Sequence, residues 1–182
     1  MIVVAFSPDE KKIFTASDIN GARLWDLNGD KLADFDNKTS SICAVAFSPD
    51  GKKILSGSFD GTSQLWDIEE NSVLLELKFI GHNGRIELVA FSPDGKTILT
   101  GSNDGTVRLW DLKRNSFRVF KGHTDNVISV AFSPDGKRIL TGSLDDFLRS
   151  DKIEPLSAQQ KKQYGITDPL LLKQKTIKKN VQ

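Results

Sequence analysis

One short phrase recurs four times along this chain at a nearly constant spacing. Ala-Phe-Ser-Pro-Asp starts at Ala5, Ala46, Ala90 and Ala131, so the steps are 41, 44 and 41 residues. Two other pairs follow the same steps, namely Trp-Asp at Trp25, Trp66 and Trp110 and Gly-His at Gly81 and Gly122. A fixed period in the low forties indicates a supersecondary unit that is used repeatedly.

Two turn signals divide each unit into strands. Residues 92–95, Ser-Pro-Asp-Gly, combine a proline, whose φ is about −65°, with a glycine that can take a positive φ. Residues 103–105, Asn-Asp-Gly, predict a second hairpin turn. The apolar runs at 89–91, 97–100, 106–110 and 117–120 then fold back on one another, which predicts a four-stranded antiparallel meander.

The predicted strands carry apolar side chains on both faces. Val107 and Leu109 point to one side of their strand, and Trp110 points to the other. A sheet covered on both sides needs a neighbour on each side, and short sheets stacked face to face around an axis form a β-propeller. The predicted fold class is therefore all-β, a partial β-propeller of four-stranded antiparallel blades.

Residues 2–149 resemble the WD-repeat (WD40-type) family, whose units of about 40 to 45 residues carry Gly-His and then Trp-Asp. The wording AFSPDGKRILTGS is similar to the regular bacterial members. The resemblance implies an incomplete propeller of about three and a half blades, with units at about 2–35, 42–79 and 86–120 and a half unit at 127–149. It also implies a non-catalytic scaffold that binds other proteins, with no cofactor.

The units depart from the pattern at single positions. Glu10 stands where the later turns have glycine, so that turn is expected to strain or to change type. Ile19 takes the aspartate position of the first unit, Lys38 the histidine position of the second, and Asp151 the tryptophan position of the last. Only the third unit has the full set.

In the resembled family a loop histidine, a strand serine, a turn aspartate and a tryptophan form a hydrogen-bonded tetrad in each blade. The resemblance assigns this structural role to His82, Ser102, Asp104 and Trp110. Partial tetrads fall at Ser58, Asp60 and Trp66, at His123, Ser143 and Asp145, and at Ser17 and Trp25. A chain from indole through hydroxyl and imidazole to carboxylate would pair every buried polar atom. The minor alternative is a hydrolase, because serine, histidine and aspartate also make a nucleophilic triad.

Other chemistry lacks the residues it needs. Two histidines and one cysteine, widely separated, give no metal-ligand spacing. The turns at Asp60, Asp104 and Asp135 lack the clustered oxygen ligands of a calcium loop. The glycine-rich stretches 56–58 and 100–102 lie within predicted strands, with no helix to make a phosphate cradle. We therefore expect no metal, no cofactor and no enzymatic activity.

Charge and hydropathy bear on partners and location. The net charge of +1 gives no reason to expect nucleic acid, and no apolar run reaches the roughly 20 residues that span a membrane. The single Cys43 lies in an apolar strand and predicts a reducing, cytoplasmic compartment. Seven lysines against two acidic residues give residues 152–182 a charge of +5. This basic tail, 150–182, is either disordered or helical near its end, where it would shield the open propeller.

One end of the predicted propeller is the candidate protein-binding face. It carries the residue before each turn aspartate and the residues where first strands begin, which are Phe59, Asn103, Leu144, Ser41, Arg85 and Asn126. Exposed apolar turn residues are typical interface anchors, although scattered surface apolarity explains them equally well.

The incomplete ring leaves three possibilities open. The chain is part of a larger repeat protein, a remnant without independent function, or a subunit that associates with itself through exposed blade faces. A dimer would supply eight blade positions, two of them without outer strands.

Overall fold

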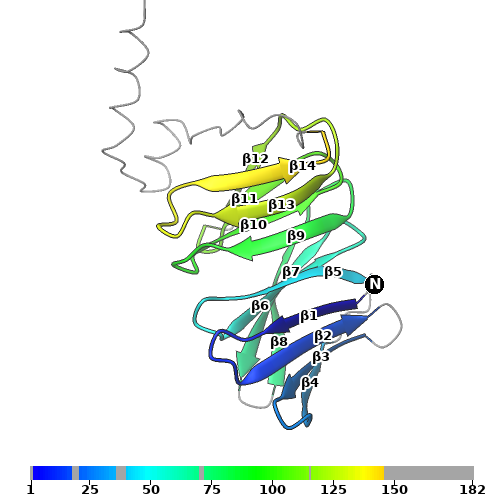
Figure 1. Ribbon diagram of the computed structural model, residues 1–182, viewed down its shortest axis with the longest axis vertical. Coiled ribbons are helices and arrows are strands. Elements are labelled where there is room, and N and C mark those ends of the chain that lie inside the picture. Colours follow the sequence, from blue (N-terminus) through cyan, green and yellow to red (C-terminus); the bar gives the residue numbers. More distant parts are fainter. Residues whose placement is uncertain (1, 18–20, 36–39, 70–71, 115, 146–182) are drawn as a thin grey trace, which may run out of the picture.

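The computed structural model describes residues 2–17, 21–35, 40–69, 72–114 and 116–145. Within these residues every regular element is a strand, and fourteen strands form four antiparallel sheets (Figure 1). The predicted tail helix lies outside the described residues, as do Ile19, Lys38 and Asp151.

Three of the sheets have four strands, and we call them blades 1 to 3. Blade 1 contains β1 (Ile2–Phe6), β2 (Lys12–Ser17), β3 (Gly21–Asp26) and β4 (Lys31–Phe35). Blade 2 contains β5 (Ile42–Phe47), β6 (Lys53–Ser58), β7 (Ser63–Glu69) and β8 (Ser72–Phe79). Blade 3 contains β9 (Ile86–Phe91), β10 (Thr97–Ser102), β11 (Val107–Asp111) and β12 (Ser116–Phe120). Half blade 4 contains β13 (Val127–Phe132) and β14 (Ile139–Ser143).

Every sheet is a meander in which each strand pairs with the next one in the chain. The predicted all-β class and partial propeller of four-stranded blades are therefore confirmed. The first strands of the sheets, β1, β5, β9 and β13, lie beside one another and form the inner edge of the stack (Figure 1).

Ser-Pro-Asp-Gly turns join the first two strands of blades 2 and 3 and of half blade 4, and Ser-Pro-Asp-Glu joins those of blade 1. Gly95 has a φ of +67°, and its amide donates to the Ser92 carbonyl at 2.9 Å. Glu10 keeps the same turn, with a φ of +57° and a 2.9 Å bond from its amide to the Ser7 carbonyl. Of the two expected outcomes at Glu10, the backbone strain is therefore the one found, at a cost of about 1–2 kcal/mol.

Apolar side chains of neighbouring sheets form three clusters, one at each boundary. Between blades 1 and 2, Phe14 and Leu24 contribute to the same cluster as Ile54 and Trp66. Trp110 takes the corresponding place between blades 2 and 3. Each of these tryptophans thus faces the blade before its own.

The last strand of a blade contributes a phenylalanine to this contact. The ring centroids of Phe35 and Trp66 lie 5.3 Å apart, and those of Phe79 and Trp110 lie 5.1 Å apart. Such inclined ring pairs are favoured by the aromatic quadrupole. Phe120 has the same place in β12, but no tryptophan of the described residues contacts it.

Two strand glycines let neighbouring blades approach closely. A Cβ at Gly57 would lie 2.9 Å from the Ile86 Cβ, and a Cβ at Gly101 would lie 2.9 Å from the Val130 Cγ1. Both glycines lie within strands, β6 and β10, as the sequence predicted. The first strand of the following blade occupies the space that a side chain would need.

Candidate functional site

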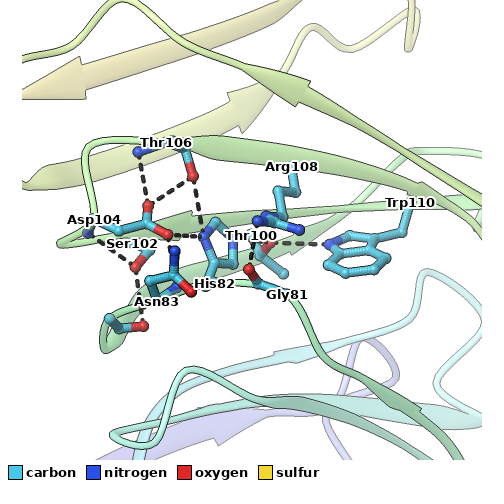
Figure 2. Close-up of polar contacts among 10 residues, drawn as sticks. Gly81, His82, Asn83, Thr100, Ser102, Asp104, Thr106, Arg108 and Trp110 are labelled. Carbon is cyan, nitrogen blue, oxygen red and sulfur yellow. Dashed lines mark hydrogen bonds and ion pairs between the residues drawn. The ribbon is translucent and has the colours of Figure 1, made fainter.

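His82 lies at the centre of a polar cluster in blade 3 (Figure 2). Its Nε2 is 2.8 Å from the Thr100 hydroxyl, and its Nδ1 is 3.0 Å from the Asp104 carboxylate. The Trp110 indole N–H donates to the same Thr100 oxygen at 3.0 Å. A continuous chain of hydrogen bonds therefore runs from the indole through threonine and histidine to the aspartate.

The sequence analysis gave the bridging hydroxyl to Ser102, and this was wrong. Trp110 lies opposite Ile98 in the pairing of β10 with β11, so Thr100 is its diagonal neighbour on the same face. Ser102 is two residues nearer the turn. Its hydroxyl donates to the Gly84 carbonyl at 3.0 Å and accepts the Asp104 amide at 3.1 Å.

The same correction applies to the other blades. The tryptophan N–H donates to Thr15 at 2.8 Å in blade 1 and to Ser56 at 3.0 Å in blade 2, each ten residues before its tryptophan. Ser17 and Ser58, the predicted partners, do not make these bonds. The Ser58 hydroxyl is buried without a partner among the described residues. A hydroxyl ten positions before each tryptophan was the signal in the sequence that identifies these residues.

Asp60 is separate from the tryptophan of its blade. Its carboxylate accepts the Thr62 amide at 3.0 Å and the Thr62 hydroxyl at 2.7 Å. The partial tetrad predicted for blade 2 is therefore not assembled as one cluster.

Asp104 is held as a carboxylate by several donors. It accepts the Thr106 hydroxyl at 2.6 Å, the Thr106 amide at 2.9 Å and the Asn83 amide at 3.0 Å, in addition to His82. Burial by itself would raise the pKa of Asp104, but these hydrogen bonds outweigh it and lower the pKa to about 2. Asn83 and Thr106 were not singled out from the sequence.

His82 is neutral in this cluster. Burial disfavours the imidazolium and lowers the pKa of His82, although Asp104 acts in the opposite direction. With the proton on Nδ1, the ring donates to Asp104 and accepts the Thr100 hydroxyl, and every group has a matching partner. The contact with Asp104 is thus a hydrogen bond to a carboxylate rather than an ion pair near pH 7.

Arg108 contacts the glycine of the Gly-His pair. Its guanidinium donates to the Gly81 carbonyl and lies 4.9 Å from the Phe117 ring centroid. A Cβ at Gly81 would lie 2.9 Å from the Arg108 Cζ, so the end of the arginine side chain would have to move to admit one.

Half blade 4 repeats the cluster in part. His123 Nε2 is 2.9 Å from the Thr141 hydroxyl, and His123 Nδ1 is 3.4 Å from Asp145. Hydrogen bonds from the Thr124 hydroxyl and amide lower the pKa of Asp145 well below its usual range. The Ser143 hydroxyl donates to the Asp125 carbonyl at 3.0 Å, as Ser102 does to Gly84.

In blade 3 the hydroxyl beside the His82 imidazole is that of Thr100 rather than Ser102, and Thr100 is fully buried and also accepts the Trp110 indole N–H. Ser102 and His82 bond to different groups, and the His82 side chain is only 1% exposed. A hydrolase would need the serine hydroxyl within hydrogen-bond reach of the imidazole. Among the described residues no group of three or more His, Cys, Asp or Glu side chains could hold a metal ion.

The six residues of the predicted binding face meet at one end of the blades. Each turn residue donates its amide to the carbonyl of a residue at the start of a first strand, and the three pairs are Phe59 to Ser41 at 2.9 Å, Asn103 to Arg85 at 3.0 Å and Leu144 to Asn126 at 3.1 Å. We call these six residues the turn face. The Phe59 and Leu144 side chains are 62% and 52% exposed. Arg85 connects two blades, since its Cζ lies 5.9 Å from the Phe59 ring centroid.

Stacked four-stranded sheets, each with a tryptophan tied to a strand hydroxyl, define a repeat protein built of β-propeller blades. Residues 29–67, 74–111 and 114–149 match the model of one family, described as WD40: WD domain, G-beta repeat. These segments make up more than half of the sequence, so the chain belongs to the WD40 repeat family, whose domains are generally non-catalytic interaction modules. No curated protein matches the chain.

The matched segments are offset from the blades by one strand. Segment 74–111 begins in β8 of blade 2 and continues through β9, β10 and β11 of blade 3. Each repeat therefore crosses a blade boundary. In segment 74–111, the contact of Phe79 with Trp110 joins blades 2 and 3. No helix of the described residues is long and apolar enough to span a membrane.

Proposed function

We propose that this protein is a non-catalytic scaffold module that binds another protein through the turn face. The observation that carries the proposal is the display of Phe59 and Leu144, two large apolar side chains, on equivalent turns of a rigid stack. Membership of the WD40 family supports the general role. The His82 cluster then has a structural role, since its polar groups satisfy one another inside the blade.

The neighbours of Phe59 suit a protein interface. The Arg85 guanidinium lies over the Phe59 ring and also donates to Glu87 at 2.9 Å, so the aromatic side chain has a cationic, positioned neighbour. Aromatic and arginine side chains are the residues that most often dominate binding energy at protein interfaces. We place the interaction in the cytoplasm because Cys43 is the single cysteine of the sequence and cannot form an internal disulfide.

The test is site-specific cross-linking followed by binding measurements. A photoreactive residue at position 59 should capture a protein that the same residue at position 27 does not capture. Leu27 is the control because it is 59% exposed and follows β3 at the opposite end of blade 1. Phe59→Ala with Leu144→Ala should then weaken binding of the purified partner about tenfold or more. Unchanged binding would remove both residues from the site.

A remnant without independent function is the second candidate, and exposed apolar side chains on β1 favour it. Val4 is 67% exposed and Phe6 is 65% exposed. Thermal melting separates the two candidates. A cooperative melt together with a specific partner supports the scaffold, whereas broad melting with precipitation supports the remnant.

A further inference from the structure

β14 has the same sequence as a strand that is paired on both sides. Residues 98–102 and 139–143 both read Ile-Leu-Thr-Gly-Ser. β10, which contains the first of these, pairs with both β9 and β11. Among the described residues β14 pairs only with β13. The second edge of β14 corresponds to the edge of β10 that pairs with β11 in blade 3.

The side chain that β11 brings to this edge in blade 3 is Trp110. It lies opposite Ile98, donates to Thr100 and contacts the Phe79 ring of the preceding blade. All three contacts therefore depend on one tryptophan.

Half blade 4 has counterparts of the three residues that contact Trp110. No tryptophan among the described residues contacts these counterparts. Ile139 corresponds to Ile98, Thr141 to Thr100 and Phe120 to Phe79, so one pattern of groups is repeated. The Thr141 oxygen is 2.9 Å from His123 Nε2, and a hydroxyl oxygen has a second lone pair for an indole N–H. Ile139 and Phe120 pack against the cluster that separates blade 3 from half blade 4.

A groove with a volume of about 1110 Å³ begins at Ile139, which is one of its lining residues. Its apolar lining includes Leu109, Phe132 and Ile139. Six basic side chains and three aspartates also line it, a net charge of +3. The basic residues are Lys53, Lys96, Lys113, Arg114, Lys137 and Arg138.

From residue 151 onward, the sequence that follows β14 does not match the chemistry of this groove. In the register of blade 3, Asp151 takes the tryptophan position. A carboxylate against an apolar lining is costly unless it is paired. Residues 152–182 carry a charge of +5, which has the same sign as the groove.

We propose that β14 and this groove bind an extended segment of a partner protein that adds to half blade 4 as its third strand. The segment inserts a tryptophan between Ile139 and Phe120, with its indole N–H on Thr141, and carries acidic residues that face the basic rim. Backbone pairing supplies affinity and the aromatic side chain supplies specificity, as in other cases of strand addition. The site lies at the Ser-Pro-Asp-Gly end of the blades and is separate from the turn face.

The probe is a fluorescein-labelled peptide that contains Thr-Val-Arg-Leu-Trp-Asp, the sequence of residues 106–111, between pairs of glutamates. Fluorescence anisotropy with the full chain should show saturable binding that weakens as salt is raised. The same peptide with alanine in place of tryptophan, or with lysine flanks, should bind about tenfold more weakly or worse. Equal binding of the tryptophan and alanine peptides would overturn the proposal.

Protein variants locate the peptide. Thr141→Val removes the indole acceptor with little change of shape, and the double variant Lys137→Glu with Arg138→Glu reverses charge on an exposed turn. Each should weaken binding, whereas Phe59→Ala, on the turn face, should not. If Thr141→Val destabilises the protein, the double variant Lys137→Glu with Arg138→Glu still tests the proposal. Undiminished peptide binding by this double variant would overturn it. If the peptide does not bind at β14, the proposal for the turn face still stands. If the turn face binds no partner, the proposal for β14 still stands.

Hydrogen exchange tests whether the edge is available. Amides of β14 should exchange rapidly in the full chain and become protected when the peptide is added. Slow exchange without peptide would overturn the proposal. In that case a monomer by light scattering would assign the edge to the chain's own residues 146–182, and a dimer would assign it to a second copy.

Discussion

One hydroxyl group fixes each described tryptophan of this protein. Thr100 accepts the indole N–H of Trp110 and contacts His82, so a single oxygen connects two strands with the loop before the blade. Thr15 and Ser56 accept the indole N–H in blades 1 and 2. A buried donor without an acceptor costs about 1–3 kcal/mol, which makes this hydroxyl a sensitive position in each blade.

Replacing Thr100 should therefore cost more than replacing Ser102. Thr100→Val keeps the shape but leaves Trp110 and His82 without their common partner, and we expect the free energy of unfolding to fall by about 1–3 kcal/mol. Ser102→Ala removes two part-buried bonds to main-chain groups, to the Gly84 carbonyl and from the Asp104 amide, and should cost about 0.5–1.5 kcal/mol. Urea denaturation of both variants measures the difference. A larger loss in Ser102→Ala would contradict the hydrogen bonding that we describe.

Acidification should destabilise the protein through His82 first. Burial lowers the pKa of His82 in the folded state, so below about pH 6.5 the unfolded chain binds a proton that the folded chain does not. Stability should fall as the pH drops below that value, by at most about 1.4 kcal/mol per pH unit for one proton. Asp104 acts at lower pH, because its stabilisation is present above 3.8 and is lost as the pH falls through about 2.

The measurement is urea unfolding at a series of pH values for the native protein and for His82→Gln. The variant lacks the titrating group, so its stability should change less between pH 7 and 5.5. The same pH dependence in both proteins would show that His82 does not titrate as described.

An element could be predicted from the sequence where the residues that determine it are close together in the chain. The turns at 92–95 and 103–105 depend on a few adjacent residues, and the strands on either side followed from them. Thr100 was missed because the strand register, rather than its neighbours in sequence, places it beside Trp110. Arg108 was missed because its partner Gly81 lies 27 residues away.

Close packing between strands of different blades gives a prediction for Gly57 in β6. Gly57→Ala would place a Cβ against Ile86 of the next blade, and such overpacking costs about 1–3 kcal/mol. Gly142→Ala in β14 is the matched control, because its Cβ would lie 3.4 Å from the Ser129 Cβ, close to ordinary contact. Thermal melting should show a clear loss for the first variant and little change for the second. Equal losses would mean that glycine itself, rather than the approach of Ile86, matters.

The stack as a whole has two apolar ends within the described residues. On β1 the exposed Val4 and Phe6 face away from blade 2, whereas Val3 packs into the cluster between blades 1 and 2. At the other end, Ile128 is 42% exposed and Leu140 is 59% exposed. Stacked repeats need a cover on such faces, because apolar area of this kind promotes association.

The face on β1 should therefore contribute to any self-association. Val4→Ser with Phe6→Ser removes two apolar side chains that are mostly exposed, so folding should persist while association at high concentration decreases. Leu27→Ser, at an exposed site after β3, is the control that should leave association unchanged. Light scattering over a concentration series provides the measurement. If the native protein is already a soluble monomer at micromolar concentration, the blade faces do not bind one another.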